Sequence, residues 1–306
     1  MLEVRDLSRS FGSFRALDGV SFTVEPGRLT GFVGANGAGK TTAMRIIMGV
    51  LSADSGEVYL DGQTVDRRID STFGYMPEER GLYPKMGVRE QLVFFAQLHG
   101  LAKAKAEENT DRLLARLGLT ERAKDAVEKL SLGNQQRAQI AAALVHDPAL
   151  LVLDEPFSGL DPIAVDTVMG VLKDFAARGA PILFSSHQLD VVERITDDLI
   201  IIAGGQVKAS GATAALQAEY AGSRYRIDLP AGVPPDWLAG LGGIADVSVA
   251  ERRAGDERAA SGTVVSFDAT PDAAQAVLRQ ALTLGPVEGF DRVMPPLSEV
   301  FREVIA

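Results

Sequence analysis

The sequence of 306 residues contains no cysteine, which excludes disulfide bonds and thiolate metal sites. Long apolar runs are also missing: Leu199–Ala203 is among the longest, whereas a membrane-spanning helix needs about 20 apolar residues. Acidic side chains outnumber basic ones by 41 to 31, and the net charge of −10 argues against an extended nucleic-acid surface. Met1–Asp6 shows no secretory signal. We therefore expect a cytosolic protein with no direct membrane insertion and no nucleic-acid partner.

A phosphate-binding loop is the clearest motif that is present. Residues 34–41 match the pattern G-x-x-x-x-G-K-[ST] at every fixed position. Glycines allow successive backbone N–H groups to converge on phosphate oxygens, Lys40 would neutralise phosphate charge, and the hydroxyl of Thr41 would bind Mg²⁺. The apolar run Leu29–Val33 and the helical spacing of Thr41–Met48 predict the strand and helix that such a loop joins. The predicted nucleotide-binding residues here are Gly34, Ala35, Asn36, Gly37, Ala38, Gly39, Lys40, Thr41 and Thr42.

Four further motifs follow in an order that resembles the ATP-binding cassette (ABC) family. They are Leu130–Arg137 (LSLGNQQR), Leu150–Pro156 (LLVLDEP), Ser158–Asp161 (SGLD) and the pair Ser186-His187. The resemblance covers roughly the first 210 residues. It implies an α/β fold with a P-loop NTPase core and a helical arm, and ATP and Mg²⁺ as ligands.

An Asp-Glu pair after an apolar run is the candidate hydrolytic site. Leu150–Leu153 reads as a strand buried on both faces, which brings Asp154 to the sheet edge where nucleotides bind. We expect Asp154 to bind Mg²⁺ and Glu155 to accept a proton from the attacking water as general base. The alternative is a solvated strand end. His187 follows another apolar run and would emerge at the same edge; the resemblance implies that it contacts the γ-phosphate and the attacking water.

The segment Leu130–Asn134 (LSLGN) resembles the family signature LSGGQ, from which it differs at Leu132 and Asn134. It keeps Ser131 and Gly133, a hydroxyl and a glycine N–H at the start of a helix, which together form an anion site. By resemblance this site contacts the γ-phosphate bound by a partner subunit. Because the chain has one phosphate-binding loop, we expect it to act as a dimer.

Three more site residues follow from the resemblance. Phe11 stands where the family has an aromatic ring that stacks on adenine, although a core phenylalanine is the alternative. Glu78 replaces a glutamine that contacts Mg²⁺; its carboxylate could still reach the metal but cannot donate a hydrogen bond. Asp161 would lie at the subunit interface and couple the two sites.

The chain is long enough for two domains. We expect residues 1–221 to form the ABC ATPase domain, ending in a hairpin around Gly204-Gly205, with a helical arm over about 79–146. In the arm, Leu82 and Tyr83 are either an exposed anchor for a partner or packed within it. Residues 222–306 alternate short strands and helices in the order βαββαβ, which predicts a small ferredoxin-like α+β domain closed by an amphipathic helix.

The resemblance is strongest to exporter subunits encoded by two-gene systems. It implies an ATP-hydrolysing subunit that powers a separately encoded transmembrane permease and exports a drug-like, ion or lipid-like substrate. The permease would recruit a dimer of this chain, or a pair with a paralogous ATPase, to the cytoplasmic face of the membrane. An ABC-class ATPase that acts on a soluble macromolecular partner is the alternative. A third possibility, a binding-only subunit, is disfavoured because Glu155, His187, Ser131 and Gly133 are all present.

Overall fold

The computed structural model describes residues 1–65, 72–79, 81–230, 235–252 and 262–305. These residues form two compact units. The first comprises Met1–Leu216 and the last residues of the chain, and the second comprises Gln217–Val300. None of the helices in the described ranges is long and apolar enough to cross a bilayer.

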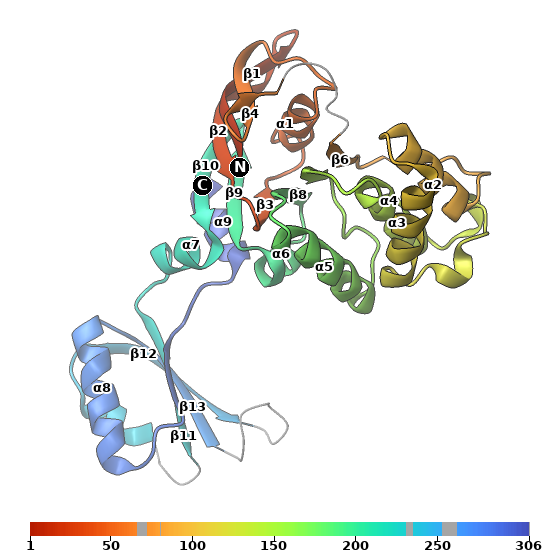
Figure 1. Cartoon of the computed structure of the whole chain (residues 1–306). Helices are drawn as coiled ribbons and strands as arrows, with labels where there is room; N and C mark the ends of the chain where they lie inside the picture. The colour runs from red at the N-terminus through yellow and green to blue at the C-terminus, as the bar shows by residue number, and fades with distance from the viewer. Residues whose placement is uncertain (66–71, 80, 231–234, 253–261, 306) are drawn as a thin grey trace. The chain divides into compact units, whose positions relative to one another are not determined.

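A six-stranded sheet forms the centre of the first unit (Figure 1). In their order across the sheet, its strands are β10 (Gln206–Ala212), β9 (Asp198–Ala203), β3 (Leu29–Val33), β8 (Ile182–Ser186), β7 (Leu150–Leu153) and β6 (Phe73–Met76). The five strands from β9 to β6 run parallel, and β10 is antiparallel to β9. Every residue of β3, β7 and β8 is buried, as the apolar runs predict for a sheet covered on both faces.

Helices cover this sheet and connect its strands. The helices of this part are α1 (Lys40–Ile47), α5 (Pro162–Ala177), α6 (Leu189–Ile195) and α7 (Thr213–Glu219). Because β3, β7 and β8 are parallel, the loops that leave their carboxyl ends meet at one edge of the sheet. The predicted hairpin at Gly204-Gly205 joins β9 to β10, and both glycines have positive φ.

A second, antiparallel sheet packs on the same core. Its strands, in spatial order, are β2 (Phe14–Val24), β1 (Leu2–Phe11), β4 (Ser55–Leu60) and β5 (Gln63–Thr64). Phe22 of β2 lies against Phe32 of β3, with ring centroids 5.3 Å apart, so the two sheets share one apolar core. At the other end of the β1–β2 hairpin, Phe11 is paired with Phe14.

The helical arm contains three α-helices and two short 3₁₀-helices, and α2, α3 and α4 contact one another (Figure 1). In chain order these elements are α2 (Val88–Leu98), α3 (Lys103–Arg116), η1 (Thr120–Arg122), η2 (Val127–Lys129) and α4 (Leu132–Leu144). The sequence predicts this helix over about 134–146, but α4 begins at Leu132, because Ser131 is its N-cap and accepts a hydrogen bond from the Asn134 N–H. Tyr83 is exposed although its ring stacks on Phe95, whereas Leu82 is half-buried.

The second unit contains a four-stranded antiparallel sheet and one long helix. Its elements in chain order are β11 (Arg224–Pro230), η3 (Pro235–Gly240), β12 (Ile244–Arg252), β13 (Gly262–Ala269), α8 (Pro271–Leu284) and β14 (Gly289–Arg292). The spatial order of the strands is β12-β13-β11-β14. The first predicted helix of this region is the 3₁₀-helix η3. The predicted closing helix is α9 (Leu297–Ile305), in which Leu297 and Val300 are buried.

Candidate functional site

The phosphate-binding loop leaves the end of β3 and leads into α1. Two of its glycines are required by close backbone contacts. A Cβ at Gly34 would lie 2.5 Å from the Ile202 carbonyl oxygen, and one at Gly39 would lie 2.6 Å from that of Ala16. Gly39 also has a φ of 110°, which other residues rarely adopt. It is the N-cap of α1 and offers no side-chain hydrogen bond, so N–H groups at the start of the helix remain available to a phosphate.

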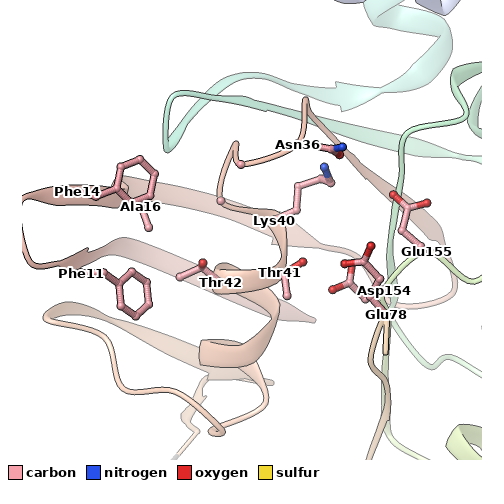
Figure 2. A pocket seen from close by; sticks show the side chains of 12 residues that line it. Phe11, Phe14, Ala16, Asn36, Lys40, Thr41, Thr42, Glu78, Asp154 and Glu155 are labelled. Carbon is pink, nitrogen blue, oxygen red and sulfur yellow. The ribbon is translucent and has the colours of Figure 1, made fainter. Parts of the chain in front are cut away.

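A cavity of about 280 Å³ lies beside this loop (Figure 2). In Figure 2 the rings of Phe11 and Phe14 lie at one end, the carboxylates of Asp154 and Glu155 at the other, and Lys40 between them. The cavity therefore has an aromatic end and a charged end. A nucleotide likewise has an aromatic base at one end and charged phosphates at the other. Its lining residues are Phe11, Phe14, Ala16, Asn36, Gly37, Gly39, Lys40, Thr41, Thr42, Glu78, Asp154 and Glu155.

Lys40 is nearly buried and its ammonium group turns back onto the loop. Nζ donates to the carbonyl oxygens of Gly34 at 2.7 Å and of Ala35 at 3.3 Å. Burial lowers the pKa of Lys40, and the carboxylates of Glu155, Asp154 and Glu78 oppose this shift. The ammonium group is thus placed to exchange carbonyl partners for phosphate oxygens.

Asp154 is buried, and its two carboxylate oxygens have different surroundings. Oδ1 accepts a hydrogen bond from the hydroxyl of Ser185 in β8, whereas Oδ2 has no hydrogen-bond partner among the described residues. An unpartnered buried carboxylate oxygen, in a cavity that Thr41 and Glu78 also line, fits a hard cation such as Mg²⁺. The described residues include no group of three or more His, Cys, Asp or Glu side chains that could bind a metal by themselves, and Mg²⁺ usually takes substrate phosphates as additional ligands.

Glu155 and His187 are in contact. His187 Nδ1 lies 2.9 Å from Glu155 Oε2, and Glu155 is 12% exposed against 57% for His187. The contact arises because β7 and β8 are adjacent parallel strands whose carboxyl ends deliver both residues to one edge. The Glu155 backbone has a φ of 52°, and its N–H donates to Ser185 Oγ at 2.9 Å.

Ser131, Gly133 and Asp161 do not line this cavity. Ser131 is the N-cap of α4, and Gly133 lies in its first turn. Asp161 is the N-cap of α5, where its Oδ1 accepts a hydrogen bond from the Ala164 N–H at 2.8 Å. Within one chain these residues therefore begin helices and are not part of the nucleotide cavity.

Phe11 is not a core residue. Its side chain is 48% exposed, and the Arg9 guanidinium lies 5.0 Å from the ring centroid. The core alternative for Phe11 is therefore wrong. Phe14 lines the same end of the cavity and was not among the predicted site residues, although its pairing with Phe11 across a short turn follows once the hairpin is known.

Three polar side chains that sequence analysis did not single out also contact the site loops. They are Ser185, described above, and two glutamines of α4. Gln136 Nε2 donates to the carbonyl oxygens of Glu155 and Pro156, and Gln139 Nε2 donates to those of Pro77 and Glu79. The sequence shows that Gln136 and Gln139 are three positions apart on one predicted helix, but it does not indicate which groups they contact.

Known proteins resemble this chain in both sequence and fold. A family model described as ABC transporter matches residues 17–158, which include the phosphate-binding loop, Asp154 and Glu155. The uncharacterized ABC transporter ATP-binding protein YhaQ of Bacillus subtilis is 42% identical over 211 residues, or 69% of this chain and 71% of its own. The linearmycin resistance ATP-binding protein LnrL of the same organism is 31% identical over 251 residues, or 81% of each chain. A solved ATP-binding subunit of an ABC transporter matches with a TM-score of 0.67 at 32% identity, covering 72% of this chain and 93% of the other.

Proposed function

The chain belongs to the ABC transporter ATP-binding proteins, which are ATPases coupled to transport, and from this premise we propose that ATP is hydrolysed in the cavity described above with Glu155 as general base. The observation that carries the proposal is the contact of 2.9 Å between Glu155 and His187, at the charged end of the cavity that also contains Lys40 and Asp154. A carboxylate oriented by an imidazole beside a phosphate-binding loop is suited to accept a proton from water.

The nucleotide would extend along the cavity. Adenine stacks on the exposed ring of Phe11, and the phosphates meet the ammonium group of Lys40 and the N–H groups of the loop residues that line the cavity, 36–37 and 39–42. Gly34, Ala35 and Ala38, also predicted to bind the nucleotide, do not line it. Stacking uses the face of the base and not its edge. Discrimination between ATP and GTP is therefore expected to be weak.

The oxygen donors around Asp154 fit Mg²⁺. Thr41 and Asp154 would bind it directly or through water, and Glu78 is a third oxygen donor on the same cavity. When bound, Mg²⁺ supplies positive charge beside the β- and γ-phosphates. Glu78 stands where the family has glutamine and adds negative charge near Lys40.

In the hydrolytic step, Glu155 takes the proton of the attacking water. His187 holds the Glu155 carboxylate through Nδ1 and orients the water and the γ-phosphate. Lys40 neutralises the charge that builds on the phosphate oxygens as the bond to the leaving group breaks.

We assign Ser131, Gly133 and Asp161 to the nucleotide site of a second subunit. Support comes from their position outside the cavity of their own chain and from the N-terminal location of Ser131 and Gly133 on α4, where an anion is stabilised. The working assembly is a dimer of two copies of this chain, or a pair with a paralogous ATPase. Each ATP would be contacted by both subunits.

The membrane partner is a separately encoded permease, which keeps the ATPase at the cytoplasmic face. Exposed Tyr83, with Leu82 beside it, is the proposed anchor for this partner on the helical arm. The proposed activity is export of a drug-like, ion or lipid-like substrate. Similarity to a Nod factor export ATP-binding protein over 72% of the chain supports export, and similarity to a linearmycin resistance protein over 81% of the chain supports a drug-like substrate.

The proposed domain boundary lies at residues 221 and 222. The second domain, predicted as 222–306, is proposed to be ferredoxin-like as far as β14, whereas the last residues of the chain, Phe301–Ala306, group with the first unit. This assignment is supported by the chain order β11-η3-β12-β13-α8-β14 and by the antiparallel pairing of neighbouring strands in the spatial order β12-β13-β11-β14.

Phosphate release from Mg²⁺-ATP tests the assignment. Glu155→Gln removes the base but preserves the side chain's shape, and we expect a loss of roughly 10²–10⁴-fold in kcat. A variant as fast as the wild type would reject Glu155 as the base. Co-purification with a membrane protein that changes the rate separates the transport function from an ATPase that acts on a soluble macromolecular partner.

A further inference from the structure

The backbone of Glu155 adopts a conformation that most residues avoid. Its φ is 52°, in the left-handed region that favours glycine, although the residue carries a side chain. Residues in such conformations persist where surrounding contacts restrain them, and they are common at functional sites. The contacts of this peptide segment therefore matter for the position of the carboxylate.

Both backbone hydrogen-bonding groups of Glu155 are bonded to side chains from other elements. The N–H donates to Ser185 Oγ of β8 at 2.9 Å. The carbonyl oxygen accepts from Gln136 Nε2 of α4 at 3.0 Å and also from the backbone N–H of Ser158 at 3.2 Å. The Gln136 amide nitrogen donates to the Pro156 carbonyl oxygen as well, also at 3.0 Å. Gln136 is half-buried, so these bonds are partly shielded from water.

Helix α4 carries two other glutamines that bond in the same way to different loops. Gln135 Nε2 donates to the carbonyl oxygens of Val127 and Leu130, both at 3.1 Å, in the segment that precedes the helix. Gln139 Nε2 donates to the carbonyl oxygens that flank Glu78. Of the three, Gln136 alone contacts Glu155. Gln135 is consequently a matched control on the same helix for the structure of the Glu155 segment, but not for the rate, because it bonds the segment that leads into Ser131.

We propose that Gln136 is a positioning residue for hydrolysis. It fixes the Glu155 and Pro156 carbonyl groups, and thereby keeps the Glu155 carboxylate against His187 and directed at the attacking water. This role rests on the proposed function, in which Glu155 is the general base. Gln136 itself contacts neither the reacting atoms nor the cavity. Its loss should therefore lower kcat while the affinity for ATP stays nearly unchanged.

The test compares Gln136→Met, Gln135→Met, Glu155→Gln and the double variant Gln136→Met/Glu155→Gln of the full chain. Methionine has a similar length and helix propensity but offers no N–H donor. We expect Gln136→Met to lower kcat by roughly 10- to 100-fold with KM within about twofold, as for residues that orient a catalytic group.

The double variant separates positioning from general structural damage. If Gln136 acts through Glu155, adding Gln136→Met to Glu155→Gln should cause no further loss of kcat. An equal loss in both backgrounds, or a wild-type rate in Gln136→Met, would each overturn the proposal. Wild-type activity in Glu155→Gln would instead reject the proposed base, so the two failures are distinguishable.

Amide hydrogen exchange provides a readout that does not depend on turnover. The amides of Glu155, Phe157 and Ser158 should exchange faster in Gln136→Met than in the wild type, because the segment 155–158 loses the donor that holds two of its carbonyl groups and opens more readily. Gln135→Met should leave this segment unchanged, and both variants should retain the overall protection of the β7 and β8 strands. Unchanged exchange of residues 155–158 in Gln136→Met would contradict the inference even if hydrolysis were slow.

Discussion

His146 should make the stability of the protein depend on pH. Its ring is buried, stacks on His99 with centroids 3.7 Å apart, and has Nε2 3.0 Å from the Phe73 carbonyl oxygen. Nε2 is therefore the protonated nitrogen of the neutral ring. Nδ1 has no hydrogen-bond partner in the described part of the chain, so a second proton there would be buried without an acceptor. Burial, reinforced by His99, lowers the pKa of His146 from 6.5 to about 4.

The sign and size of the effect follow from this shift. Because the pKa is lower in the folded protein, the unfolded chain binds more protons between pH 6.5 and 4, and stability falls as the pH falls through that window. One pH unit corresponds to about 1.4 kcal/mol. Between pH 7 and pH 5 the free energy of unfolding should fall by about 2 kcal/mol on account of His146. This is a sizeable share of the roughly 5–15 kcal/mol typical of folded domains.

Urea denaturation at pH 7 and pH 5 measures the effect. His146→Gln removes the titrating ring but retains an N–H donor near the Phe73 carbonyl group. We expect the wild type to lose about 2 kcal/mol more than this variant between the two pH values, while carboxylates common to both chains cancel in the comparison. Equal losses in the two proteins would refute the reasoning, because they would mean that His146 titrates alike in the folded and unfolded states.

Two further substitutions test individual contacts. Ser185→Ala should lower the free energy of unfolding by about 1.5–3 kcal/mol, because the buried Asp154 carboxylate loses a donor. The loss should be smaller in Ser186→Ala, where the hydroxyl accepts from the backbone N–H of Gln188. Equal losses of the two variants in denaturant titrations would contradict this expectation. Phe11→Ala should weaken ATP binding about 5- to 150-fold, because stacking of a base on an aromatic ring is worth about 1–3 kcal/mol. Phe11→Tyr should bind normally in titrations with a fluorescent ATP analogue. Unchanged binding by Phe11→Ala would show that Phe11 does not stack on the base, and Phe14 would become the candidate.

The fold of the first unit was largely predictable because its signals are local. Leu150–Leu153 and Leu29–Val33 are continuous apolar runs, and both are strands with every residue buried. The glycines at 204 and 205 follow a third apolar run, Leu199–Ala203, and form the turn of the predicted hairpin. Boundaries were less accurate, since the start of α4 depends on which serine or asparagine becomes the N-cap.

The side-chain contacts of the site were harder to predict. Parallel strands ending in Glu155 and Ser186-His187 predict a common edge, and the structure brings Glu155 and His187 into contact. The hydrogen bonds that Glu155 makes with Ser185 and with Gln136 join residues 30 and 19 positions apart. They depend on the register of the strands and on the direction of the side chains. No spacing in the sequence encodes either quantity. The left-handed backbone of Glu155 was invisible for the same reason.

Helix α4 has a consequence for how two subunits would work together. Its N-cap, Ser131, is proposed to contact the nucleotide of the neighbouring subunit, and Gln136 follows five residues later, about 7.5 Å along the helix axis. A helical turn and a half is too stiff for its two ends to respond separately. When Ser131 of one subunit contacts the ATP of the other, the position of Glu155 in the subunit that contains this Ser131 would therefore change as well. The two hydrolysis events in a dimer are then expected to be cooperative, and the rate should rise sigmoidally with ATP concentration.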